Sequence, residues 1–111
     1  MIEEFLINYL NGKLAVEVYG DIPTPMPTRF ITVEKTGSSE LNHIQQATIA
    51  VQSWAESRYE AMVLNEMVKN AMKEAIELDE ISRSHCRTDY NYTDTTTKRY
   101  RYQAVFEVVF Y

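Results

Sequence analysis

Hydrophobic residues recur with a helical period through the middle of this chain, from about residue 55 to 78. The apolar positions there form one stripe: Ala61, Leu64, Met67, Val68, Ala71, Met72, Ala75 and Leu78. The polar positions fall on the other side: Asn65, Glu66, Lys69, Asn70, Lys73 and Glu77. The pattern predicts a long amphipathic helix that lies on a sheet.

Both ends of this helix carry sequence signals. Ser53 and Glu56 have the spacing of a capping box, and Ser57 and Glu60 repeat that spacing one turn later, so the first residue stays open. Four acidic residues crowd the other end, where the helix dipole disfavours them: Glu74, Glu77, Asp79 and Glu80. Either the helix ends early, which is the favoured interpretation, or a basic partner lies there.

The N-terminal region predicts a short helix and then a strand. Residues 2–10 place apolar side chains at helical spacing, and Asn11-Gly12 is a stop signal. Residues 14–19 alternate with period two, which is typical of a half-buried strand, and Gly20-Asp21 closes it.

Prolines then stand at every second position, at 23, 25 and 27. Each removes a backbone N–H donor, so these residues are excluded from a central strand. A proline-rich ligand would space its prolines three apart, and this segment has no such pair. The segment is predicted to be a rigid, extended lead-in along a sheet edge.

The rest of the chain predicts a hairpin and a long final strand. The hairpin joins Arg29–Thr36 to His43–Ser53 through a turn at Gly37-Ser38-Ser39. Residues 79–97 are rich in polar residues and predict a loop, with one short strand at Ile81–Cys86. The final strand alternates and is predicted to be central to the sheet. Its core face holds Tyr100, Tyr102, Ala104, Phe106, Val108 and Phe110, and its other face holds Arg99, Arg101, Gln103, Glu107 and Tyr111.

These elements predict an α+β fold: a mostly antiparallel sheet of four or five strands, one long helix across a face, and a short N-terminal helix. The chain has 111 residues, of which 45% are hydrophobic and 24% charged. That length and composition predict a single globular domain over residues 1–111.

Net charge, apolar run length and cysteine count exclude some classes of partner and indicate a cellular compartment. A net charge of −5 argues against a specific nucleic-acid partner. No apolar run reaches membrane-spanning length, the first residues are acidic, and Cys86 is the single cysteine, so we expect a protein kept in a cytosol without a membrane partner.

No reacting group stands out. His85, Cys86 and Asp89 are metal-ligand or nucleophile types, but there is no second cysteine, and His43 is the one other histidine. The basic and aromatic residues from Lys98 to Tyr102 alternate, so a strand would point them to opposite faces. We therefore expect no catalytic residue, no cofactor and no metal.

The arrangement resembles the tail terminator (tail completion) proteins of long-tailed bacteriophages. The resemblance covers most of the chain. Its motifs are Pro25-x-Pro27-x-x-Phe30-Ile31-x-Val33, then Thr36-Gly37, Ala50-Val51-Gln52-Ser53-Trp54-Ala55, Glu60-Ala61, and Arg99-Tyr100. Ser38 stands where the family usually has a second glycine, and an aspartate before the last strand, Asp89 or Asp94, fits loosely.

The resemblance implies a structural assembly protein that is not an enzyme. It implies a homo-oligomeric ring, commonly of six subunits, on the head-proximal end of the tail tube. Its partners would be the tail tube protein and the head–tail connector or neck protein. Its locations would be the virion tail and, during assembly, the host cytoplasm.

Two segments are expected at protein contacts. The stiff lead-in would contribute Pro25, Pro27 and Arg29, and the outward row of the last strand would contribute Arg99, Arg101 and Glu107. A solvated face is the alternative for that row. For the whole chain the alternatives are a head-closure protein of the neck or, from another class, a small cytosolic enzyme or ligand-binding domain.

Overall fold

The computed structural model describes residues 1–93, 96 and 99–110. Its elements follow in the order α1 (Ile2–Lys13), β1 (Val18–Tyr19), β2 (Phe30–Leu41), β3 (Ile44–Ala55), α2 (Arg58–Glu74), a 3₁₀ turn η1 (Ala75–Glu77), β4 (Ile81–Asn91) and β5 (Tyr100–Phe110). The predicted α+β fold, with a mostly antiparallel sheet, one long helix and a short N-terminal helix, is confirmed. None of the helices among the described residues is long and apolar enough to cross a membrane.

The five strands form one sheet in the order β1-β2-β3-β5-β4. β1 runs parallel to β2, and every other neighbouring pair is antiparallel. β5 is internal, as predicted, since it pairs with β3 along one side and with β4 along the other, although the middle strand is β3.

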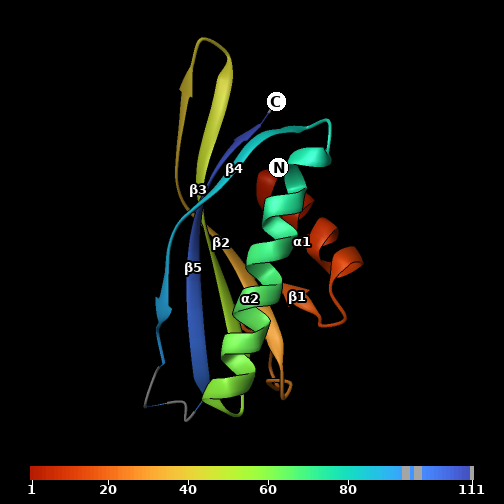
Figure 1. The fold of residues 1–111 in the computed structure, drawn as a ribbon, viewed down its shortest axis with the longest axis vertical. Helices are drawn as coiled ribbons and strands as arrows, with labels where there is room; N and C mark the ends of the chain where they lie inside the picture. The colour runs from red at the N-terminus through yellow and green to blue at the C-terminus, as the bar shows by residue number, and fades with distance from the viewer. Residues whose placement is uncertain (94–95, 97–98, 111) are drawn as a thin grey trace.

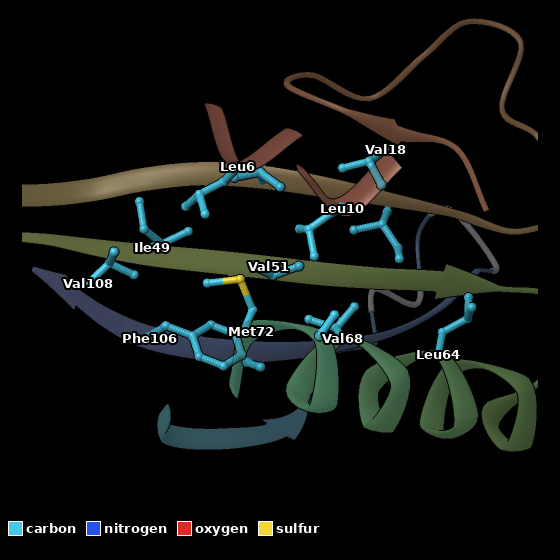
Figure 2. Close-up of a cluster of buried hydrophobic side chains, with 14 of the residues drawn as sticks. Leu6, Leu10, Val18, Ile49, Val51, Leu64, Val68, Met72, Phe106 and Val108 are labelled. Atoms are coloured by element: carbon cyan, nitrogen blue, oxygen red, sulfur yellow. The ribbon is translucent and has the colours of Figure 1, made fainter. Parts of the chain in front are cut away.

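Both helices cover the same face of the sheet (Figure 1). The predicted stripe of α2 is buried at Leu64, Val68 and Ala71, and α1 adds Leu6 and Leu10. These side chains meet apolar residues of β3 and β5 (Figure 2). Burial of apolar surface of this kind is the dominant favourable contribution to folding.

The two ends of α2 can now be compared with the signals in the sequence. Ser57 is the N-cap, and its side chain accepts a hydrogen bond of 3.2 Å from the backbone N–H of Glu60, so the second of the two capping signals is used. The α-helix ends at Glu74 and continues as the 3₁₀ turn η1 to Glu77, so of the four acidic residues only Asp79 and Glu80 lie beyond it. Lys13 of α1 also lies 2.7 Å from the Glu74 carboxylate, so a basic group is present there as well.

The predicted first strand is wrong in extent. α1 continues through the stop signal to Lys13, and β1 contains only Val18 and Tyr19. The side chain of Asn11 explains this, because its amide donates to the Val18 carbonyl at 3.2 Å and its oxygen accepts from the Val18 N–H at 3.0 Å. Asn11 therefore bonds to the edge strand from within the helix.

The predicted hairpin exists, but its turn at 37–39 is wrong. The turn residues are Asn42 and His43, with φ of 52° and 67°, between the paired residues Leu41 and Ile44. Positive φ at both central residues is typical of a two-residue hairpin turn, for which asparagine is well suited. Gly37 instead follows a register shift within β2, because a β-bulge there accommodates one extra residue.

β4 is much longer than the predicted strand at 81–86. It pairs with β5 from Ile81 to Asn91, with two register shifts along its length. Most of its side chains are exposed on both faces because it is an edge strand, so it lacks the apolar alternation that marks β3 and β5.

Candidate functional site

One face of the sheet carries no helix, and we call it the uncovered face. Strand register places Thr32, Gln52, Gln103 and Tyr90 side by side on it, one from each of β2, β3, β5 and β4. Their side chains form a chain of hydrogen bonds of 3.2, 2.6 and 2.5 Å. The Trp54 indole N–H also donates to the Thr32 hydroxyl at 3.2 Å. The row links four strands and fixes their side chains on this face.

Arg101 lies beside this row, between two aromatic rings. Its guanidinium carbon is 4.5 Å from the Trp54 ring centre and 4.4 Å from that of Tyr92. Its Nε–H donates to the Tyr92 carbonyl at 2.9 Å. Trp54 in turn stacks on Phe30 with ring centres 5.3 Å apart. Arg101 thus faces outward as predicted, but it is packed in place.

Arg99 binds the proline segment, which we call the strap (residues 20–29). It donates to the carbonyls of Pro27 at 2.6 Å and of Met26 and Thr28 at 3.3 Å each. The strap leads into β2, and β3 separates β2 from β5, so the strap must cross the end of the sheet to reach Arg99. The predicted path along a sheet edge is therefore incomplete. The three carbonyls converge on one cation, which holds this part of the strap against the start of β5.

Of the other predicted interface residues, Pro25 and Arg29 belong to the strap, and Glu107 lies apart from it. Pro25 and Arg29 are exposed. Glu107 lies eight positions along β5 from Arg99, roughly 26 Å away at strand spacing. Its carboxylate is 3.6 Å from Arg87 in a surface ion pair of small energetic value. The structure therefore brings Pro27, Arg99 and Arg101 together and leaves Glu107 outside; we call these three residues with the strap the strap surface.

Tyr100 and Asn65 differ from their predicted positions. Tyr100 is 40% exposed at the start of β5, whereas Tyr102 packs against the core as predicted. Asn65, predicted on the polar side of α2, is buried, with 2% of its surface exposed. Its amide donates to the Asp89 carboxylate at 2.8 Å, and Lys69 reaches the same carboxylate at 3.3 Å. The Asp89 partner satisfies the amide N–H of Asn65, while the Asn65 side-chain oxygen has no hydrogen-bond partner among the described residues.

Strand register separates the side chains of His85 and Cys86. His85 pairs with Glu107 on the uncovered face, while Cys86 pairs with Phe106 on the helix side. Burial raises the pKa of the Cys86 thiol, and the Asp89 carboxylate adds to the rise. The described residues contain no group of three or more His, Cys, Asp or Glu arranged to hold a metal.

The described surface also has open hollows of about 240 to 410 Å³. One of about 410 Å³ lies between the strap and the uncovered face and includes Arg101, Gln52 and Asp21 in its wall. Charged and amide groups around a hollow of this kind suit a protein side chain as well as a small ligand. Comparison of the chain with protein-family models and with curated protein sequences found no match.

Proposed function

We propose that this protein is a tail terminator of a long-tailed bacteriophage or prophage. Copies of the chain associate into a ring, commonly of six, on the head-proximal end of the tail tube. The ring ends tube polymerisation and joins the tail to the neck. The protein acts by binding other proteins and is not an enzyme.

The observation that supports this most is the strap surface. Arg99 connects two segments 72 residues apart, both of which the sequence analysis expects at protein contacts. A binding surface whose backbone is already held loses less conformational entropy on association. The element order from α1 to β5 also agrees with the arrangement on which the resemblance rests.

The proposal is tested on tail tubes. Tube protein encoded beside the gene is polymerised with and without this chain, and the tubes are imaged by electron microscopy. We expect growth to stop and a ring to appear at one tube end. Tubes of unchanged length without rings would overturn the proposal.

A strap variant sharpens the test. Pro25→Gly with Pro27→Gly should leave the chain folded by circular dichroism but weaken its binding, because a flexible strap must be ordered at the contact. Thr24→Gly with Thr28→Gly is the matched control, since it adds the same two glycines and keeps both prolines. Binding of the proline variant as tight as that of wild type would remove the strap from the contact.

A head-closure protein of the neck is the second candidate, because it would use the same kind of rigid surface one layer higher. It is distinguished by its target: it should bind the assembled connector and leave bare tubes unchanged.

A further inference from the structure

The sheet extends past both helices at the end opposite the strap, where β2 turns into β3 (Figure 1, top). Leu41 and Ile44 flank the turn there as a cross-strand pair and are 74% and 49% exposed. This pair and its turn extend past β5, which pairs with β3 only as far as Gln45. We propose that this end of the sheet is the contact by which one copy of the chain binds the next, an inference that rests on the self-association in the proposed function.

The alternation of side chains along β3 shows on which face of the sheet the side chains of the hairpin end lie. β3 pairs with β5 without a register shift from Gln45 to Ala55. Ile49 and Val51 face the helices, so Ile44, at an even position, faces away from them, together with its partner Leu41. Val109 of β5 lies on the same face, opposite Gln46. Leu41, Ile44 and Val109 form what we call the apolar tip.

A hollow of matching character lies at the same end on the helix side. Its volume is about 320 Å³, and its apolar wall consists of Met1, Ile2, Phe5, Ile81 and Phe110. Met1 is 84% exposed beside it. An engineered cavity of about 150 Å³ can hold a benzene molecule, so this hollow has room for two aliphatic side chains.

One copy cannot fill its own hollow with its own tip, because the two lie on opposite faces of the same strands. A second copy can, and each copy then offers a tip to one neighbour and a hollow to another. Such a head-to-tail contact closes into a ring when the rotation between copies permits it.

Charge complementarity selects a second copy as the occupant. Arg83 lies beside the tip, since it pairs with Val109, and Glu80 lines the hollow. Lys35 also lines the hollow, but its ammonium group is 4.0 Å from the Glu3 carboxylate of its own chain. Neither Arg83 nor Glu80 has an ion-pair partner within the described residues. A tip with a cation therefore meets a hollow with an anion.

The first test removes the apolar tip. Leu41→Ser with Ile44→Ser should raise the dissociation constant for self-association roughly 100-fold, measured by sedimentation equilibrium. The matched control is Tyr59→Ser with Met62→Ser on α2, whose side chains are 73% and 41% exposed, and it should associate like wild type. Circular dichroism confirms that both variants fold.

The second test exchanges the charges. Arg83→Glu alone and Glu80→Lys alone should each weaken self-association about tenfold, and the double variant should recover it, because every contact then pairs the reversed charges. No effect of either single change, or no recovery in the double variant, would overturn the charge pairing.

The outcomes separate this contact from the proposed function. If wild type forms rings on tubes and the tip variant associates as tightly as wild type, the tip contact is wrong and the proposed function stands. If wild type neither associates at any concentration nor binds tubes, both are wrong. Loss of association in the tip variant, with an unaffected α2 control, supports the contact.

Discussion

Replacing Arg99 with alanine tests whether the strap is held by side-chain bonds from β5. The variant loses one hydrogen bond of 2.6 Å and two of 3.3 Å to backbone carbonyls. A hydrogen bond to a charged group contributes about 1.5–3 kcal/mol. The longer two are weak and share the donor group, so we count the set as one full bond and expect a loss of about 2 kcal/mol.

The assay is urea unfolding of wild type, Arg99→Ala and Arg99→Lys at equal protein concentration. The alanine variant should shift the midpoint without changing the slope, and lysine should lose roughly half as much because it keeps the charge but not the forked donors. Arg29→Ala is the control, since its exposed side chain should change stability by less than about 0.5 kcal/mol. Limited proteolysis within the strap should also accelerate in the alanine variant, because the freed segment opens more readily.

An Arg99→Ala variant as stable as Arg29→Ala, with unchanged proteolysis of the strap, would refute the reasoning. The strap would then be held by its own conformational stiffness.

Three further predictions concern the core, the pH dependence and the uncovered face. Val68→Asp should destabilise the fold by at least about 3 kcal/mol because it buries an unpaired charge, whereas Lys73→Ala on the exposed side should change little, and equal melting temperatures would contradict the assignment. Burial raises the pKa of Tyr9, whose hydroxyl donates to the Ala71 carbonyl at 2.7 Å. The protonated hydroxyl contributes its full share of the free energy of unfolding below the ordinary tyrosine pKa of 10.0, and this share is lost as pH rises through the higher pKa of the folded state. In unfolding titrations wild type should therefore lose stability above pH 10.0 relative to Tyr9→Phe. Arg101→Glu should cost about 1–2 kcal/mol in urea unfolding, because it loses contact with two aromatic rings; an unchanged midpoint would mean that Arg101 is solvated.

The sequence predicts the parts of the fold whose residues differ between two faces. The stripe of α2 and the alternation of β5 are visible because one side is buried and the other is not. β4 has no such contrast: it is an edge strand with exposed residues on both faces, and pairing with β5 determines its length. The turn was misplaced because a glycine signals both a turn and a bulge, and the actual turn uses Asn42 and His43.

The candidate site is predictable in its segments but not in its contacts. Prolines at 23 to 27 indicate a stiff segment, and alternation in β5 indicates that Arg101 faces outward. The Arg99 bonds could not be predicted, because they join residues 72 positions apart whose meeting depends on the strand order. Burial of Asn65 depends likewise on Asp89 from β4.

The central claim is that this chain closes into a ring on the end of a tail tube. Electron microscopy of the purified protein, alone over a range of concentrations and mixed with tail tubes, tests it most directly, with native mass spectrometry of the same samples. The account predicts closed rings at one end of each tube, with a mass that is a fixed multiple of the 13.0 kDa chain. Monomers at every concentration, on bare and unchanged tubes, would contradict it.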